Sequence, residues 1–380
     1  MDVTSWLLRR TAPRVLLLTA PGGTGARLAV ERFARERGWR LAMSPAEANT
    51  VIVAGDDHRF EEHVRQVWDT VPAPRVRVDV ATAADAEHEL DTVLGMLHDT
   101  ARQRAEAARA ASPVQTAHAE HVAEDGHGDH DEHAAHEDHQ PHGGHEPHNE
   151  HGTHEGHESH ADHGSHGDHG GSGHMGHGGH DHHMSGMELP GGLPMADRAE
   201  DRDGLTLDQL HVPLGPALPL WPAGLIVHTR LQGDVIQRAS VELLAAHHDS
   251  FWSHHPAARR LDSCYRLLAL AGWEDAATTA QRLRDDALSG DVPDVRRWAS
   301  RVRRSRTLRW LLSGVGVTTA GDDALDRLHR WLDSTTEPPS TRWTVDVLPA
   351  LLEGAELGTA RLIVASLDFE VHTAGEVHHG

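Results

Sequence analysis

Histidines recur at every third position through the middle of this chain. Fifteen follow one another from His127 to His169, and residues 118–183 hold 22 of the 36 histidines, 15 acidic residues and no arginine or lysine. Imidazole is a good ligand for Ni²⁺, Zn²⁺, Cu²⁺ and Co²⁺, and carboxylates can assist it. In polyproline II, with three residues per turn, such a series would line one edge. The spacing therefore predicts binding of divalent metal at several sites, without one fixed four-ligand geometry.

The predicted metal ligands are the regularly spaced histidines and the five that follow them. They are His127, His130, His133, His136, His139, His142, His145, His148, His151, His154, His157, His160, His163, His166, His169, His174, His177, His180, His182 and His183. A pH-responsive or solubilising spacer is the alternative interpretation, because imidazoles titrate close to neutral pH. A segment so poor in apolar residues cannot offset its ordering entropy, so we expect a disordered linker over residues 116–190.

The linker separates two arms, residues 1–115 and 191–380, each long enough for a modest hydrophobic core. Of the net charge of −23, residues 118–183 carry −15, which leaves −8 on the remainder of the chain. This balance argues against a nucleic-acid-binding protein, which usually has a basic face. Cys264 is the single cysteine, so the chain forms no internal disulfide. No apolar run reaches 18 residues, and we expect a protein that is cytoplasmic or peripheral at the inner face of the membrane.

Apolar runs and helical periodicity alternate along the first arm. Strands are predicted over 14–20, 50–54 and 75–80, and helices over 26–38, 60–70 and 85–111. This order predicts a small parallel sheet in a flavodoxin-like α/β domain. The glycines of PGGTGAR, after the first strand, favour a tight strand-to-helix turn over a nucleotide site. The chain has no lysine for a phosphate loop, and the third glycine of a dinucleotide fingerprint is missing.

The second arm predicts an α+β, mainly helical domain. Residues 211–235 form two strands around a Gln232-Gly233 turn, and helices are predicted over 260–270, 273–288 and 295–312. The last of these helices contains seven arginines between residues 296 and 309. They indicate either a solvated helix paired with nearby aspartates or a docking surface for an acidic partner or anionic headgroups.

Other candidate chemistry outside the histidine-rich segment is weaker. His247-His248 and His254-His255 flank a short aromatic stretch; polar residues at a helix end explain them better than a second metal site. The tail histidines His372, His378 and His379 are expected in a frayed terminus. Cys264 lies in an apolar helix and is expected to be structural rather than a nucleophile.

Residues 39–86 carry a series of motifs in a fixed order and spacing. They are Ser44-Pro45, Ala48-Asn49, Val53-Ala54-Gly55, Arg65-Gln66-Val67-Trp68-Asp69 and Pro72-Ala73-Pro74. On these motifs the arm resembles the 20-kDa subunit of respiratory complex I and the small subunits of [NiFe]-hydrogenases. The resemblance implies a four-iron cluster held by cysteines after the strands. Here residues 22–26 and 81–83 lack them, so we expect no iron–sulfur cluster.

The second arm begins with another motif series. It consists of Gly215-Pro216, Pro219, Gly224-Leu225, Leu231, Gly233-Asp234 and Val235. On these residues it resembles the 49-kDa subunit of complex I and hydrogenase large subunits, in a truncated form without nickel-binding cysteines. Leu218, Leu220 and Trp221 replace the family's quinone-facing histidines, and residues 360–370 resemble its closing strand segment.

The two resemblances imply a fusion of degenerate small and large subunits joined by the histidine-rich linker. We therefore expect a non-catalytic accessory subunit of a membrane-associated NADH-quinone oxidoreductase-like or [NiFe]-hydrogenase-like complex, with that complex's other subunits and metal ions as partners. A nickel or zinc metallochaperone or metal-storage protein is the alternative. An enzyme with an unfamiliar site ranks third.

Overall fold

The computed structural model describes residues 10–111, 197–200, 206–244, 250–291, 294–333 and 344–369. The expected linker and all twenty predicted histidine ligands lie outside these ranges, as do His247, His248 and the tail histidines. Residues 1–113 and 192–380 belong to one structural unit. Both arms are parts of this unit.

The first arm contains a parallel sheet, as the sequence predicts. Its strands are β1 (Arg14–Thr19), β2 (Arg40–Leu41), β3 (Thr50–Ala54) and β4 (Val76–Val80). The order across the sheet is β2-β1-β3-β4, and every neighbouring pair is parallel. The two-residue β2 was not predicted, because so short a strand leaves no periodicity to detect. The order reverses at β1, and open α/β sheets usually bind ligands beside such a reversal.

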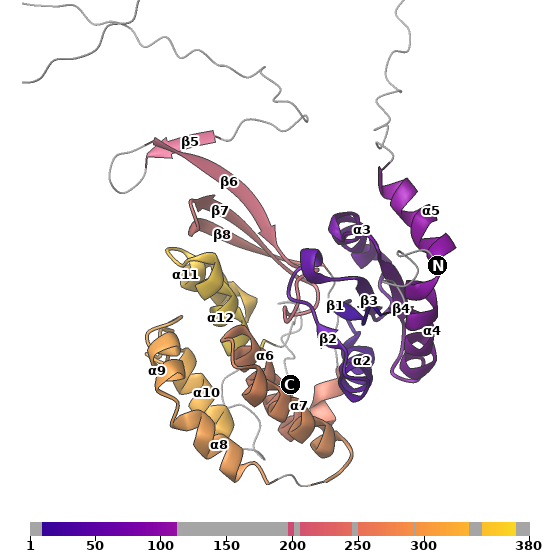
Figure 1. Ribbon diagram of the computed structural model, residues 1–380. Coiled ribbons are helices and arrows are strands. Elements are labelled where there is room, and N and C mark those ends of the chain that lie inside the picture. The colour runs from indigo at the N-terminus through magenta and orange to yellow at the C-terminus, as the bar shows by residue number, and fades with distance from the viewer. Residues whose placement is uncertain are drawn as a thin grey trace, which may run out of the picture. The chain divides into compact units, whose positions relative to one another are not determined.

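Helices cover both faces of this sheet (Figure 1). Val15 and Leu17 of β1 pack towards α2 (Thr24–Glu36) and α4 (Ala86–His98). Leu16 and Leu18 point to the opposite face, where α3 (Glu61–Thr70) lies. This alternation explains why β1 is a continuous apolar run.

The long helix predicted over 85–111 is two helices, α4 and α5 (Thr100–Ala111). Asp99 interrupts it, because its Oδ1 accepts hydrogen bonds from Ala101 N and Arg102 N over 2.9 and 3.1 Å. A side chain that binds the first free amides of a helix starts a new helix at that point.

The second arm starts with an antiparallel sheet. Strands β5 (Asp197–Glu200), β6 (Thr206–Leu214), β7 (Leu225–Gln232) and β8 (Val235–Leu243) pair in chain order. The predicted Gln232-Gly233 turn joins β7 to β8, and Gly233 has φ +61°, which favours glycine.

Two helices cover one face of this antiparallel sheet, α11 (Leu348–Leu352) and α12 (Leu357–Leu367). Leu225 and Ile236 of the sheet share a core with Leu348 and Ile363. The strand segment that the resemblance suggested over residues 360–370 is wrong, because α12 occupies most of it. A short apolar run buried on most sides does not by its pattern distinguish strand from helix.

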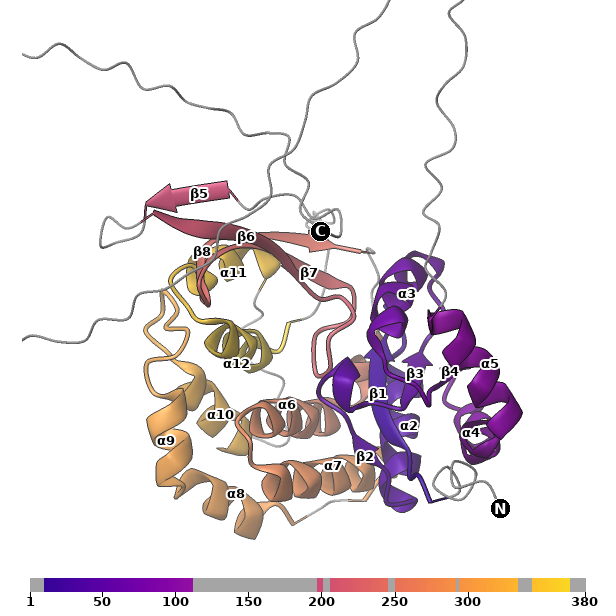
Figure 2. The same ribbon diagram turned by 45° about the horizontal axis from the view of Figure 1, so that its top comes forward.

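The described part of the arm also contains a group of α-helices between the antiparallel sheet and α11 in the sequence (Figure 2). They are α6 (Pro256–Leu270), α7 (Glu274–Leu288), α8 (Arg296–Arg303), α9 (Arg306–Leu312) and α10 (Ala324–Asp333). They share one apolar core, which includes Leu268, Trp298, Leu312 and Leu328. The single helix predicted over 295–312 is divided into α8 and α9, because the Ser305 hydroxyl accepts from Leu308 N over 3.3 Å and caps a new helix. None of the described helices is both long and apolar enough to cross a bilayer.

Candidate functional site

The turn between β1 and α2 is closed against the neighbouring strand. Ala20 N donates to Ala54 O of β3, and Gly23 N donates to Ala20 O, each over 2.9 Å. A Cβ on Gly23 would lie 2.1 Å from Ala54 O, and a Cβ on Gly55 would lie 2.7 Å from Gly23 Cα. The carboxyl ends of β1 and β3 therefore meet backbone to backbone, where only glycine fits. The structure contains the tight strand-to-helix turn that the glycines predict.

Helix α2 begins directly after this turn and presents two charged residues to the second arm. Arg27 and Glu31 lie one helical turn apart, and Arg27 Nη1 donates to Glu31 Oε1 over 2.7 Å. Arg27 also donates to both carboxylate oxygens of Asp262 on α6, over 3.1 and 2.8 Å. A guanidinium that binds both oxygens of one carboxylate is fixed in orientation as well as in distance.

Arg284 of α7 completes the cluster from the second arm. Its Nη1 donates to Glu31 Oε2 over 2.6 Å and to Asp262 Oδ1 over 2.8 Å. The side chains of Arg27, Glu31, Asp262 and Arg284 are 9, 2, 1 and 0% exposed. We call these four residues the buried ion network; two guanidinium groups balance two carboxylates within it.

Further polar residues enclose the network. Arg266, one turn along α6, donates to Asp262 Oδ2 over 2.7 Å, and Gln281 Nε2 donates to Glu31 Oε2 over 3.4 Å. Arg35 of α2 pairs with Asp285 of α7 over 2.6 Å. Side chains of α2 thus bind to α6 and α7 along two helical turns.

The charges in the network stabilise one another against the cost of burial. Burial alone would raise the pKa of Asp262, but Arg27, Arg266 and Arg284 hold that pKa far below its usual range. Burial would likewise lower the pKa of Arg27, and the charges of Asp262 and Glu31 raise it instead. Arg27, Asp262 and Arg284 are therefore ionised at neutral pH. Removing one member of the network leaves the others uncompensated.

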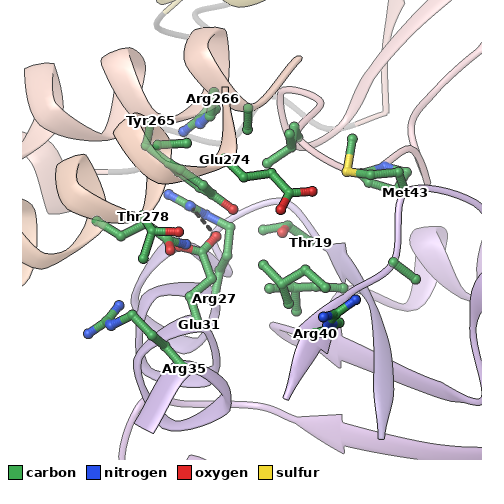
Figure 3. Close-up of a pocket in the computed structure, with 18 of the residues that line it drawn as sticks. Thr19, Arg27, Glu31, Arg35, Arg40, Met43, Tyr265, Arg266, Glu274 and Thr278 are labelled. Atoms are coloured by element: carbon green, nitrogen blue, oxygen red, sulfur yellow. Dashed lines mark hydrogen bonds and ion pairs between the residues drawn. The ribbon is translucent and has the colours of Figure 1, made fainter. Parts of the chain in front are cut away.

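A cavity of about 410 Å³ lies beside the network and is lined by both arms (Figure 3). The first arm contributes the end of β1, α2 and residues 38–43; the second contributes residues 219–223, α6 and α7. The apolar part of its wall consists of Leu17, Leu41, Leu220 and Trp221. Its volume is typical of a site for a small molecule.

Tyr265 supplies a hydrogen-bond donor at the wall of this cavity. The residue is 4% exposed and lines the cavity from α6. Burial raises the pKa of Tyr265, so the phenol keeps its proton. In Figure 3, Tyr265 and Glu274 extend from the second arm towards Thr19 and Arg27 of the first. The arrangement can hold a small molecule with one hydrogen-bond-accepting group against an apolar wall.

The structure brings together few of the residues that the sequence singled out. Leu220 and Trp221 line the cavity. Cys264 is buried and its pKa is raised by burial, as expected of a structural cysteine. His254 is exposed and His255 precedes α6, and within the described ranges no three His, Cys, Asp or Glu side chains cluster as metal ligands.

Sequence reasoning missed the buried ion network. Arg27 and Glu31 have the spacing of an ordinary surface pair on a helix. Asp262 and Arg284 look like charges at the polar edge of amphipathic helices. The available signal was that Arg27 and Glu31 interrupt the apolar side of α2, where neighbouring Leu28 and Val30 are buried. Comparisons with protein-family models, with curated proteins and with solved structures found no match to this chain.

Proposed function

We propose that this protein is a non-catalytic structural subunit of a membrane-associated complex I-like or [NiFe]-hydrogenase-like assembly, and that its histidine-rich segment binds divalent metal. The observation that carries the proposal is the buried ion network. It joins a small-subunit-like arm to a large-subunit-like arm through Arg27 and Glu31 on one side and Asp262 and Arg284 on the other. Charges this deeply buried belong to a permanent interface rather than a transient encounter.

The cavity beside the network supports the same proposal. In the family that the sequence resembles, the first loop of the large subunit carries histidines that face the quinone pocket. In this chain Thr19 and Thr24 of one arm and Leu220 and Trp221 of the other line one cavity. The family's histidines are replaced there by apolar side chains, which neither donate nor accept a proton.

The closed β1–α2 turn supports a structural rather than a redox role. The related subunits carry cluster-binding cysteines in this turn. Gly23 packs against Ala54 O so closely that any side chain on it would displace the backbone of β3. A thiolate at this position would need a different turn, and the chain's single cysteine lies far along the sequence in α6.

The donor set of the histidine-rich segment fits borderline divalent metals. Imidazoles alternate there with carboxylates, and thiolates are absent. Such a set suits Ni²⁺, Zn²⁺, Cu²⁺ or Co²⁺. Neutral imidazoles bind these ions and are displaced by protons, so metal affinity depends on pH.

The proposal is tested by isolating the tagged full-length protein from its native membranes and identifying the proteins that stay bound in mild detergent. We expect subunits of a proton-channel or hydrogenase-type assembly in fixed stoichiometry. An Asp262→Asn variant should lose them in part, because the junction weakens, whereas Glu62→Gln on the exposed surface of α3 should retain them. A protein recovered alone, saturated with nickel or zinc, would contradict the structural role and favour a metal store.

Iron–sulfur reconstitution under anaerobic conditions gives a second test of the non-catalytic role. We expect no cluster absorbance and no paramagnetic signal after desalting. A stoichiometric four-iron cluster would overturn the proposal.

A further inference from the structure

Helices α8 and α9 present an exposed basic surface. Arg297 follows the start of α8, Arg304 and Arg306 flank the Ser305 cap, and Arg309 lies on α9. All four are exposed, and none of them has an ion-pair partner among the described residues. Residues 296–313 contain no acidic side chain. We call these four arginines, together with Trp310, the arginine face.

Trp310 is the most exposed large apolar side chain in the described part of the chain, at 83%. It lies four residues after Arg306 on α9, so the indole and the guanidinium share one side of the helix. The opposite side of these two helices is apolar and packs in one core with α10 through Trp298, Val302, Leu308 and Leu312. Figures 1 and 2 both show α8 and α9 along the outer edge of the second arm, on α10.

Acidic groups near the arginine face are already engaged with other arginines. Asp275 of α7 lies 3.8 Å from Arg301, Asp333 of α10 pairs with Arg303, and Asp294 lies 3.9 Å from Arg296. His329 of α10 adds no negative charge, and burial and Arg303 lower its pKa. The four remaining arginines thus keep an uncompensated charge of +4 around an exposed indole.

We propose that the acidic histidine-rich segment of the same chain, residues 118–183, docks on the arginine face. The segment carries 15 carboxylates and no arginine or lysine, so its charge is complementary to that of the face. Its 66 residues span at most about 220 Å when extended, so reach does not limit the contact. Covalent attachment raises the effective concentration of the segment at the arginine face to the millimolar range. An anionic lipid surface or a separate acidic protein would have to compete with the segment at that concentration. Imidazole rings can also stack on the Trp310 indole.

Docking gives the metal-binding segment a regulatory consequence, and this part rests on the proposed function. Each divalent ion bound to neutral imidazoles adds two positive charges to a segment whose formal charge is −15. Metal loading therefore weakens the attraction to the arginine face and exposes it.

The test uses the full chain with a single dye on the segment. Ser159→Cys accepts a thiol-reactive oxazine dye, which tryptophan quenches on contact, whereas Cys264 is buried with a raised pKa and stays unlabelled. At about 0.01 M salt, where the Debye length is about 30 Å, we expect strong quenching. At about 1 M salt, where it is about 3 Å, fluorescence should rise at least about twofold.

Matched variants assign the quenching to the arginine face. Changing Arg297, Arg304, Arg306 and Arg309 to Gln should relieve it, as should Trp310→Leu. Changing four exposed arginines elsewhere, Arg14, Arg102, Arg238 and Arg282, removes the same charge and should leave the quenching unchanged. Replacing the segment's 15 acids by their amides should also relieve it, with every histidine retained.

Calorimetry with Ni²⁺ on the same variants separates docking from metal binding. Salt-sensitive quenching in a protein without nickel capacity supports docking and contradicts only the proposed metal binding. Quenching that persists in the Arg297/Arg304/Arg306/Arg309 variant overturns docking. Docking is also overturned if the dye is never quenched and vesicles containing phosphatidylserine bind the chain through these arginines. That result would make the arginine face a membrane-binding site.

Discussion

Four residues form a buried ion network at the junction of the two arms. Asp262 accepts hydrogen bonds from Arg27, Arg266 and Arg284, and its own side chain is 1% exposed. Exposed ion pairs contribute little to stability because water and salt screen them. A buried charge whose partner is removed pays the full desolvation cost. The stability of the junction therefore depends on every member of the network being present.

We predict that Asp262→Asn lowers the free energy of unfolding by about 3–5 kcal/mol, because it leaves three arginines around a neutral amide. Glu62→Gln is the matched control. Glu62 pairs with Arg65 on the surface of α3 over 2.7 Å, with both side chains more than half exposed. It should cost less than about 1 kcal/mol. Urea unfolding of the two variants measures the difference, and equal losses would contradict a special role for the buried network.

The same residue sets a pH dependence. The pKa of Asp262 is lower in the folded protein than in the unfolded chain, so its contribution is complete above the unfolded value of about 3.9. It is lost as the pH falls from there towards the folded pKa. The stability difference between the protein and Asp262→Asn should therefore stay constant from about pH 8 to pH 5 and shrink below about pH 4. A difference that shrinks already between pH 7 and 5 would show that Asp262 is not stabilised as a carboxylate.

The β1–α2 turn is the element that places the network. Because Gly23 packs on Ala54 O, α2 starts at Thr24, which puts Arg27 and Glu31 on the side that meets α6 and α7. The glycines of this turn are readable from the sequence as a strand-to-helix turn. The sequence does not reveal which contacts this turn makes possible. The partners of Arg27 and Glu31 lie more than two hundred positions away along the chain.

We predict that Gly23→Ala destabilises the fold by more than about 2 kcal/mol, since its Cβ would lie 2.1 Å from Ala54 O. Gly95→Ala provides the control. Gly95 lies in α4 with nothing within 4 Å of an added Cβ, so alanine should stabilise the helix by about 0.5–1 kcal/mol. Thermal unfolding by circular dichroism compares them. If both substitutions raise the melting temperature, the turn is not as close to β3 as described.

At the scale of the molecule, local patterns predicted the elements well and their assembly poorly. Three of the four strands of the parallel sheet, β1, β3 and β4, and the β7–β8 turn follow from apolar runs and glycine alone. The divisions at Asp99 and Ser305 were missed, because a capping side chain leaves the helical periodicity on either side intact. The strand expected over residues 360–370 rested on the resemblance alone, and α12 occupies most of that range. The junction of the arms could not be predicted, since charges at helical spacing look the same on a surface and at an interface.

The histidine-rich segment leads to a prediction for the whole chain. Ni²⁺ titrated at about pH 7.5 should occupy several sites, and most should be lost at about pH 5.5, below the ordinary imidazole pKa of about 6.5. Deleting residues 118–183 should abolish this capacity and leave the melting temperature almost unchanged, because the sequence predicts no packed core there. Isothermal calorimetry measures the stoichiometry. Full capacity after the deletion would move the sites elsewhere, and less than one equivalent in the intact chain would make the segment a spacer.

If the buried ion network joins the two arms into one unit, cutting the chain between them should leave the halves associated. A specific protease site placed at Gly152 allows the folded protein to be cleaved after purification, and size-exclusion chromatography at micromolar concentration then shows whether the halves part. We predict that the halves co-elute at moderate salt. The Asp262→Asn protein should separate at a lower concentration of urea than the unaltered one. Halves that elute independently after cleavage, without denaturant, would contradict the account.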